Sequence, residues 1–416
     1  MHPFTLLFLL LLLLSLGVQL WLIRRQLRHV AENREQVPEA FADSISLEEH
    51  QKAADYTLSK ARLSRYEAPY AVLVLLGLTL GGGLQWLDGI WQGMIAQPLW
   101  AGVGFILSVF LLTSLLDLPF SLYRTFRIEQ RFGFNRMTMG LFLSDLLKQT
   151  LLLLALGGPL ATLVLWLMGS MGEKWWLYVW LVWSGFSLLM LWAYPAIIAP
   201  LFNKFSPLED EAMRRRIDGL LERCGFTSNG IFVMDGSRRS AHGNAYFSGM
   251  GNNKRIVFFD TLLESLSGDE IEAVLAHELG HFRRKHVRKR LILMMLMSLA
   301  GLALLGWLSQ QQWFFLGLGI TEPSMHTALV LFLLVAPVFT FFIQPLMALS
   351  MRRHEFEADD FAAEHASAAD LIRALVKLYQ ENASTLTPDP LYSAFHDSHP
   401  PAPVRIGHLS AKIGKI

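Results

Sequence analysis

Long apolar stretches alternate with charged loops along the chain. Seven stretches have about the 20 mostly apolar residues that a helix needs to cross a bilayer, and they cover about 4–23, 69–91, 99–119, 149–169, 175–199, 291–308 and 327–349. Glycine or proline interrupts several of them, which membrane helices tolerate where neighbouring helices or water satisfy the backbone. The pattern predicts seven transmembrane helices and two polar regions, at about 201–290 and 351–416.

The first apolar stretch has two interpretations, a cleaved signal peptide or an uncleaved anchor. No Lys or Arg precedes Phe4, and no cleavage site of small residues follows the apolar run. Arg24, Arg25 and Arg28 follow instead. We therefore expect an uncleaved anchor.

Basic residues are distributed unequally between the loops. Eight Lys or Arg residues lie between residues 24 and 65 and five between 124 and 148, whereas 92–98 and 309–326 have none and 170–174 has Lys174 alone. Because such residues concentrate in cytoplasmic loops, the N-terminus is expected outside and the C-terminus and both polar regions in the cytoplasm. We expect a multi-pass protein of a bacterial inner membrane.

The composition agrees with a membrane protein that has a soluble part. Hydrophobic residues make up 53% of the chain and charged residues 17%, against about 25% charged residues in a typical soluble domain. The formal net charge of +1 gives no indication of nucleic-acid binding. Cys224, the only cysteine, excludes an intramolecular disulfide and a multi-cysteine metal cage.

The first polar region has the signals of an α+β domain. We expect a helix from 206 to 222, a strand at 231–234, and a hairpin of 244–248 with 255–259 around a loop rich in Gly and Asn. Ser267 and Glu270 then form a capping-box pattern. The helix that it starts has apolar residues three and four positions apart, at Ile271, Val274, Leu275, Leu279 and Phe282.

This capped helix contains the motif H-E-x-x-H, formed by His277, Glu278 and His281. Residues i and i+4 project from one helix face, so both imidazoles can reach one Zn²⁺ ion. Glu278 flanks that face, where it can take a proton from the attacking water. Surface histidines with acidic neighbours are the alternative interpretation. A catalytic zinc also needs a third protein ligand.

Glu355 is the candidate for the third ligand. Glu355 and Asp359 lie four residues apart just after the seventh apolar stretch, so they share a helix face. Glu355 could bind the metal while Asp359 orients a ligand histidine, and a solvated acidic face is the alternative. Glu357 points roughly to the opposite side and is the weaker candidate.

Together with the seven stretches, these motifs resemble the CAAX prenyl protease 1 family of integral-membrane zinc endopeptidases. Four further segments are similar to family motifs and occur in the family's order: 128–136 (IEQRFGFNR), 235–247 (DGSRRSAHGNAYF), 254–263 (KRIVFFDTLL), and 398–401 (SHPP) followed by Arg405. The resemblance runs from about residue 30 to the end.

The resemblance implies a fold, a mechanism and a set of site residues. Seven helices would enclose a water-filled chamber capped by a cytoplasmic α+β, zincin-like metalloprotease domain, and a peptide would add to an exposed strand edge. One Zn²⁺ ion would be bound by His277, His281 and Glu355. Glu278 would activate water, and Asp359 would support a ligand histidine. Asn244 and His399 would face the cleavage site, where His399 would stabilise the oxyanion; eukaryotic members cut after a prenylated cysteine.

On the residues alone, several of these side chains have ordinary interpretations. Asn244 is by default a polar residue flanking a turn, and His399 before two prolines could belong to a simple turn. For Arg405 we favour anchoring of the chain end to a carboxylate. His242 and His286 do not fit the ligand spacing, and His354 points away from the helix face of Glu355. The basic run at 283–290 is interpreted as an orientation signal and a lipid-headgroup contact.

The expected organisation has four parts. Residues 1–200 contain five transmembrane helices with cytoplasmic loops 24–66 and 120–148, residues 201–290 the metalloprotease domain, 291–350 the last two transmembrane helices, and 351–416 the rest of the protease domain. The expected partners are a peptide or protein substrate and the bilayer. Two alternatives remain: an HtpX-like quality-control protease, and a transporter or scaffold with structural zinc. Whether the substrate is prenylated is open.

Overall fold

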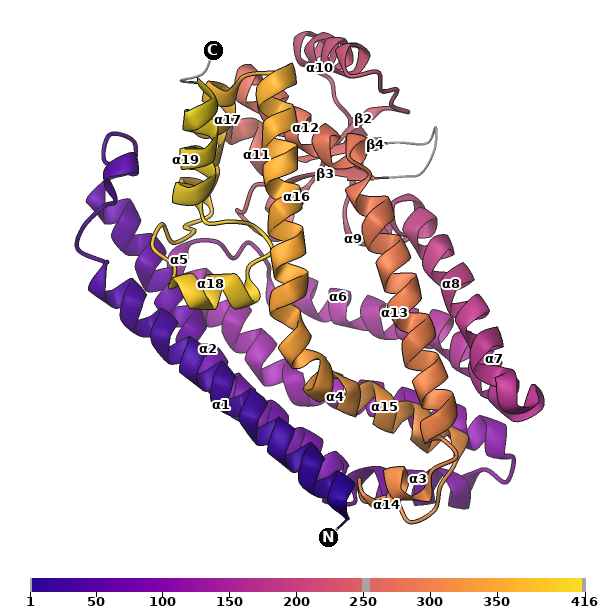
Figure 1. The fold of residues 1–416 in the computed structure, drawn as a ribbon. Helices are drawn as coiled ribbons and strands as arrows, with labels where there is room; N and C mark the ends of the chain where they lie inside the picture. Colours follow the sequence, from indigo (N-terminus) through magenta and orange to yellow (C-terminus); the bar gives the residue numbers. More distant parts are fainter. Residues whose placement is uncertain (1, 249–254, 414–416) are drawn as a thin grey trace.

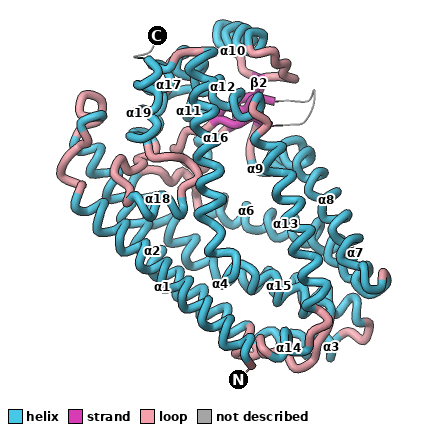
Figure 2. The backbone as a smooth tube through the Cα atoms, in the orientation of Figure 1, coloured by secondary structure: helices cyan, strands magenta, loops and turns pink. Residues whose placement is uncertain are grey.

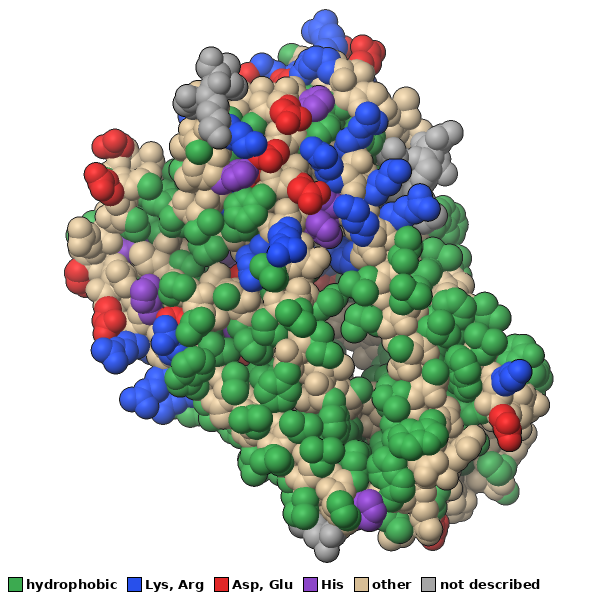
Figure 3. All heavy atoms as spheres, in the orientation of Figure 1, with side chains coloured by type: hydrophobic (Ala, Val, Ile, Leu, Met, Phe, Trp, Pro, Cys, Tyr) green, Lys and Arg blue, Asp and Glu red, His purple; other side chains and the backbone are tan. Residues whose placement is uncertain are grey.

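The computed structural model describes residues 2–248 and 255–413. Long helices form one end of the molecule, and a smaller domain with a sheet and short helices forms the other (Figures 1 and 2). Apolar side chains cover the helical end, whereas Lys, Arg, Asp, Glu and His gather over the other (Figure 3). Figure 3 also shows a hollow between the apolar helices. The architecture predicted from the sequence is confirmed: a helical membrane part with an attached α+β domain.

Eight α-helices of the described chain come before α9 and the sheet domain. They are α1 (Pro3–Glu32), α2 (Leu47–Leu78), α3 (Gly83–Met94), α4 (Pro98–Tyr123), α5 (Gln130–Phe132), α6 (Met139–Leu152), α7 (Gly158–Ser170) and α8 (Trp175–Ala193). A π-helical turn, Arg124–Glu129, joins α4 to α5. Six helical segments of the described chain are long and apolar enough to span a membrane, and the bent pair α2–α3 would be a seventh. The helix α1 continues through Arg24, Arg25 and Arg28.

The second expected span is not one straight helix. The chain bends by 48° between α2 and α3. Gly82 adopts a left-handed conformation (φ 77°), and a Cβ atom on Gly81 would lie 2.7 Å from the carbonyl oxygen of Gly77. Glycine is required because the chain turns sharply against its own preceding helix. The predicted span at 69–91 therefore consists of the last part of α2 and most of α3.

The second domain is built on a four-stranded sheet in the order β1-β2-β4-β3. The strands are β1 (Phe205–Pro207), β2 (Ile231–Met234), β3 (Ala245–Ser248) and β4 (Arg255–Phe259). β2 and β4 are parallel and the other pairs antiparallel. The predicted strand and hairpin are confirmed, whereas the hairpin loop at 249–254 lies outside the described residues. Among the described strands β3 pairs only with β4, so its outer edge is free.

The helix expected from residue 206 begins later. Phe205–Pro207 forms β1 and pairs with β2, and α10 covers Glu211–Arg223. The Asp210 side chain accepts hydrogen bonds from the backbone N–H groups of Ala212 and Met213. Asp210 therefore caps the helix, and the start predicted from the Ser206-Pro207 pair is wrong because those residues are held by the sheet.

The remaining helices are divided between the two parts (Figure 1). They are α9 (Ala199–Phe202), α11 (Asp260–Ser265), α12 (Gly268–Arg283), α13 (His286–Leu308), α14 (Gln312–Leu316), α15 (Met325–Thr340), α16 (Gln344–His365), α17 (Ala368–Glu381), α18 (Pro390–His396) and α19 (Ala402–Ile413). α13 follows α12 directly, and α16 continues from α15 into the sheet domain (Figure 1). The last two membrane helices thus position elements of the second domain.

Candidate metal centre

The helix α12 presents the H-E-x-x-H motif in a fixed position. The Ser267 side chain accepts a hydrogen bond from the Glu270 N–H, and the Glu270 carboxylate accepts one from the Ser267 N–H at 2.7 Å. This capping box satisfies two backbone N–H groups that have no partner inside the helix. Ile271, Leu275 and Leu279 pack into the domain core. The helix face that carries His277 and His281 is therefore directed toward α16.

Gly280 allows α12 and α16 to lie very close together. A Cβ atom at Gly280 would lie 3.0 Å from the Ala358 Cα atom and 3.1 Å from its carbonyl oxygen. Backbone on one helix therefore faces backbone on the other, without a side chain between them. The close approach brings Glu355 and Asp359, one turn apart on α16, to the histidine face of α12.

His277, His281 and Glu355 form a group of the right size for one metal ion. The Nε2 atoms of the two histidines are 3.2 Å apart, and Glu355 oxygens lie 3.6 Å from the His277 Nε2 atom and 3.4 Å from the His281 Nε2 atom. Ligands at the corners of a tetrahedron around Zn²⁺, with bonds of about 2.0–2.1 Å, would be separated by roughly 3.3–3.4 Å. The three side chains therefore match a tetrahedral ion with one position left over.

The charge of the group also fits a cation. Glu355 is buried, and its Oε2 atom has no hydrogen-bond partner among the described residues. Glu355 and Asp359 face one buried guanidinium, that of Arg405, so with both imidazoles neutral, as metal ligands are, the group has one negative charge in excess. Burial raises the pKa of Glu355, but the neighbouring imidazoles of His277 and His281 lower it by more, to well below its ordinary value. A buried, unpaired carboxylate oxygen is costly unless a ligand satisfies it.

Asp359 fixes the orientation of His277. The Asp359 Oδ1 atom lies 2.8 Å from the His277 Nδ1 atom, and Asp359 is fully buried. Burial lowers the pKa of His277, but the bonds to Asp359 and Glu355 raise it to about 9. Arg405 of α19 donates to both Asp359 oxygens, with 2.9 Å between Nε and Oδ2. The structure thus gives Arg405 the carboxylate partner that we favoured for it.

His286 plays the corresponding part for His281, which the sequence analysis missed. The Nδ1 atoms of the two rings are 3.0 Å apart, and the His286 Nε2 atom donates to Glu357 Oε2 at 3.0 Å. Burial lowers the pKa of His286 to about 4, so at neutral pH its uncharged ring can accept the N–H of His281. Lys285, with φ 59°, separates α12 from α13 and turns His286 back toward the motif. A basic residue in a left-handed turn has no sequence signal that predicts this contact.

Glu278, Asn244 and His399 line the space in front of the three candidate ligands. Two cavities, of about 370 and 290 Å³, share Glu278, Glu355 and His399 as lining residues, and Asn244 lines the first. The His399 Nε2 atom is 3.5 Å from Glu355 Oε1, and its side chain is 64% exposed. The Asn244 side chain accepts a hydrogen bond from the backbone N–H of Ala245 at 2.8 Å. All the residues proposed from the sequence therefore lie around one site.

The histidines set aside as non-ligands lie elsewhere or behind the site. His242 contacts Glu129, Tyr56 and Asn382. His354 stacks on His286 with 4.0 Å between ring centroids. A carboxylate base, two oriented imidazoles and a second carboxylate around a cleft form an arrangement suited to metal-assisted hydrolysis.

Two family models together match almost the whole chain. Residues 26–204 match the model described as CAAX prenyl protease N-terminal, five membrane helices. Residues 207–413 match the model of peptidase family M48. The boundary between the two matches falls next to β1, where the sheet domain begins.

Named relatives and a solved structure agree with these matches. The chain is 34% identical over 378 residues to CAAX prenyl protease 1 homolog of Arabidopsis thaliana, with 89% of each chain covered. It is 33% identical to CAAX prenyl protease 1 of Saccharomyces cerevisiae, covering 94% of this chain and 91% of that one. The crystal structure of S. mikatae Ste24p superposes with a TM-score of 0.90 at 31% identity, covering 98% of this chain and 99% of that one.

Proposed function

Because the chain belongs to the CAAX prenyl protease 1 family of M48 peptidases, and is a multi-pass membrane metalloendopeptidase, we propose that it is a zinc enzyme that cuts peptides near the C-terminus of membrane-associated proteins. One Zn²⁺ ion is held by His277, His281 and Glu355. The observation that supports this most is the set of 3.2–3.6 Å separations between their facing atoms.

Each residue has a separate task in this proposal. When bound, zinc supplies a Lewis acid that polarises the peptide carbonyl and makes water more acidic. Glu278 takes the proton from the attacking water and passes it to the leaving amine. Asp359 and His286 hold the two ligand imidazoles by their Nδ1 atoms. His399 donates to the carbonyl oxygen as negative charge develops there, and Asn244 binds the substrate backbone beside the cleavage site.

The substrate peptide lies along the free edge of β3. The two cavities that share Glu278 both border β3: Ala245 lines one, and Tyr246 and Phe247 line the other. An extended peptide paired with β3 would thus cross the site with the scissile bond next to Glu278. Asn244 and His399 also line a further cavity of about 760 Å³. This cavity gives the substrate peptide room beyond the cleavage site.

Prenylated CAAX peptides are the substrate class that we propose first, after the names of the relatives. The zinc domain lies in the cytoplasm and the N-terminus outside, since the basic loops all lie on one side. The match of residues 26–204 to the CAAX prenyl protease N-terminal family favours this assignment over the HtpX-like alternative. Membership in a peptidase family leaves the transporter or scaffold alternative without support.

Mass spectrometry of the products from matched peptides tests the proposal. The purified protein is given one peptide in two forms, with its cysteine farnesylated and with the cysteine free, and the Glu278→Gln protein is the control. We expect removal of a short C-terminal fragment from the farnesylated form and no cleavage by Glu278→Gln. Equal cleavage of both forms would contradict the substrate class and leave the zinc endopeptidase in place. Cleavage by Glu278→Gln would contradict the role of Glu278.

A further inference from the structure

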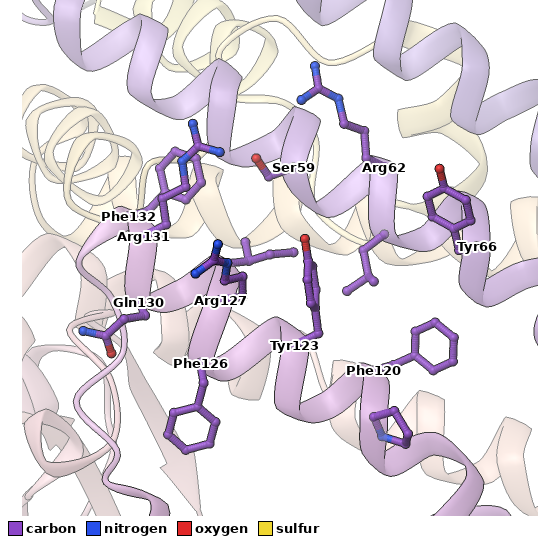
Figure 4. Close-up of a pocket in the computed structure, with 13 residues that line it drawn as sticks. Ser59, Arg62, Tyr66, Phe120, Tyr123, Phe126, Arg127, Gln130, Arg131 and Phe132 are labelled. Atoms are coloured by element: carbon purple, nitrogen blue, oxygen red, sulfur yellow. The ribbon is translucent and has the colours of Figure 1, made fainter.

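A second built feature lies away from the metal centre, between α2 and the segment from α4 to α5. It is a groove of about 920 Å³, which we call the arginine groove, and its principal lining residues are Arg62, Tyr66, Phe120, Tyr123, Arg127 and Arg131. Figure 4 shows the side chains of Arg62, Arg127 and Arg131 around Ser59. None of these residues takes part in the proposed hydrolysis.

The arginine groove is positively charged, and Asp55, which is close enough to Arg62 and Arg131 to feel their charge, is paired with Arg34 instead. No Asp or Glu is among the described residues that line it. Within the described chain, the guanidinium groups of Arg62, Arg127 and Arg131 form no ion pair or hydrogen bond, although that of Arg131 lies over the Phe132 ring. Carboxylates of the same segments have other partners: Asp55 binds Arg34, Glu67 binds Arg124, and Glu129 binds Tyr56. Three unpaired guanidinium groups in one groove favour an anion with several oxygens.

The position of the groove relative to the apolar helices indicates where that anion comes from. Its residues on α2 end at Tyr66, just before the apolar stretch predicted from residue 69, and those on α4 begin at Pro119, where another predicted stretch ends. Tyr66 is 69% exposed and Tyr123 52%. Exposed tyrosines at the ends of membrane spans are typical of the headgroup level of a bilayer. The groove is therefore charged at its outer end and aromatic toward the membrane.

The backbone of one wall is itself unusual. Arg127 lies on the π-helical turn Arg124–Glu129 between α4 and α5. π-helical turns are rare in proteins and frequent at functional sites, and the described chain has two more, Leu153–Gly157 and Tyr194–Ile198. Here the turn brings Arg127 and Ile128 to the groove while Glu129 binds Tyr56 on the other side.

We propose that the arginine groove binds the phosphate headgroup of an anionic phospholipid. The guanidinium groups of Arg62, Arg127 and Arg131 supply the positive charge that holds the headgroup, and the acyl chains leave along Tyr66, Phe120 and Tyr123 toward the bilayer. A free phosphate ion shares the headgroup chemistry, but it would leave the exposed aromatic side chains of the groove uncovered. The inference does not depend on the zinc chemistry.

Native mass spectrometry of the purified full-length protein tests this proposal. The protein is presented with equal amounts of palmitoyl-oleoyl phosphatidylglycerol and phosphatidylcholine. We expect the wild type to retain phosphatidylglycerol selectively and the Arg62→Gln, Arg127→Gln and Arg131→Gln variants each to bind it about fivefold more weakly, as expected for one basic residue at an anionic surface. Arg65→Gln is the matched control, because Arg65 lies on the same helix three residues from Arg62 and does not line the groove.

Three results would overturn the proposal. If Arg65→Gln lost as much bound lipid as Arg62→Gln, the binding would be explained by a general attraction between basic loops and lipid, and not by the groove. Equal retention of phosphatidylcholine would remove the need for a net negative headgroup. Binding of inorganic phosphate or glycerol 3-phosphate as tight as that of the lipid would assign the groove to a free anion. Thermal unfolding of each variant checks that the substitution has not unfolded the protein.

Discussion

Two buried histidine–aspartate pairs lie in different regions of this molecule, and they are built almost alike. In the helical part, His326 Nε2 lies 2.7 Å from Asp88 Oδ1, and Gln92 donates to the other Asp88 oxygen at 2.8 Å. In the metal centre, His277 Nδ1 lies 2.8 Å from Asp359 Oδ1, and Arg405 donates to the other oxygen at 2.9 Å. Both aspartates are fully buried.

The pairs differ at the second ring nitrogen of the histidine. His326 Nδ1 lies so close to Gly102 that a Cβ atom there would be 2.8 Å away, so this nitrogen faces another helix and no ligand has room. His277 Nε2 faces His281 and Glu355 beside a cavity of about 370 Å³. A buried histidine–carboxylate pair thus fastens helices together where both ring nitrogens are enclosed, and prepares a metal ligand where one is open.

The largest effect is expected from removing the third candidate ligand. Glu355→Ala should lower both zinc content and peptide hydrolysis by roughly a factor of 100 or more, because it removes one of the three proposed protein ligands of the metal. Glu357→Ala is the control on the same helix, because Glu357 contacts His286 and none of the three ligand atoms. Metal analysis and hydrolysis assays on both proteins check this. A Glu357→Ala protein that loses its metal while Glu355→Ala keeps it would reverse the assignment.

Substitution of the two aspartates should have different effects on zinc binding and on stability. Asp359→Asn should weaken zinc binding about 10–100-fold, as changes in the residues that orient ligands do. Asp88→Asn should leave zinc binding unchanged and lower the free energy of unfolding by about 1–3 kcal/mol. Zinc titration and thermal unfolding of both proteins measure the difference. Weaker zinc binding in Asp88→Asn would show that the two pairs are not functionally distinct.

A smaller effect is expected at the second ligand histidine. His286→Ala should weaken zinc binding about tenfold, because the Nδ1–H of His281 loses its acceptor and the ring is less firmly oriented. His354→Ala is the control: it removes a ring stacked on His286 but no bond to a ligand. Equal zinc affinity in His286→Ala and the wild type would contradict the proposal that His286 orients His281.

The smallest effect concerns the start of α12 and depends on pH. Burial raises the pKa of Glu270, but the bonds from Lys377 and Ser267 lower it by more, so that it lies below its ordinary value of 4.5. Because the folded-state pKa is depressed, Glu270 contributes stability above about pH 4.5, and this contribution is lost as pH falls through the folded-state pKa.

Glu270→Gln should therefore lower the free energy of unfolding by about 1–2 kcal/mol at neutral pH, and the difference from wild type should disappear in acid. Denaturant unfolding as a function of pH measures it. Glu264→Gln is the control, since Glu264 is exposed and forms no ion pair within the described chain. A difference that stays constant down to acid pH would contradict the linkage.

Much of the fold could be predicted from local sequence patterns. The apolar stretches, β2, the hairpin and the capped helix α12 follow from periodicity and capping residues within short windows. β1 was missed because its three residues are held by pairing with β2, a contact across more than 20 residues. The bend between α2 and α3 required the close approach of Gly81 to Gly77, which hydropathy does not show.

The candidate site divides in the same way. The spacing of His277, Glu278 and His281, and that of Glu355 and Asp359, are local and could be read directly. The function of Gly280 could not, because it depends on contact with Ala358 on another helix. His286 was set aside because it lies outside the motif spacing, and only the turn at Lys285 brings it back to His281.

The central claim is that three side chains hold the metal and a fourth, Glu278, performs the proton transfer. The most direct measurement is zinc content and peptide hydrolysis on the same samples of wild type, Glu278→Gln and Glu355→Ala. We expect Glu278→Gln to retain about one zinc per chain and to lose hydrolysis, whereas Glu355→Ala should lose both. A Glu278→Gln protein without zinc, or one that still hydrolyses peptide, would contradict it.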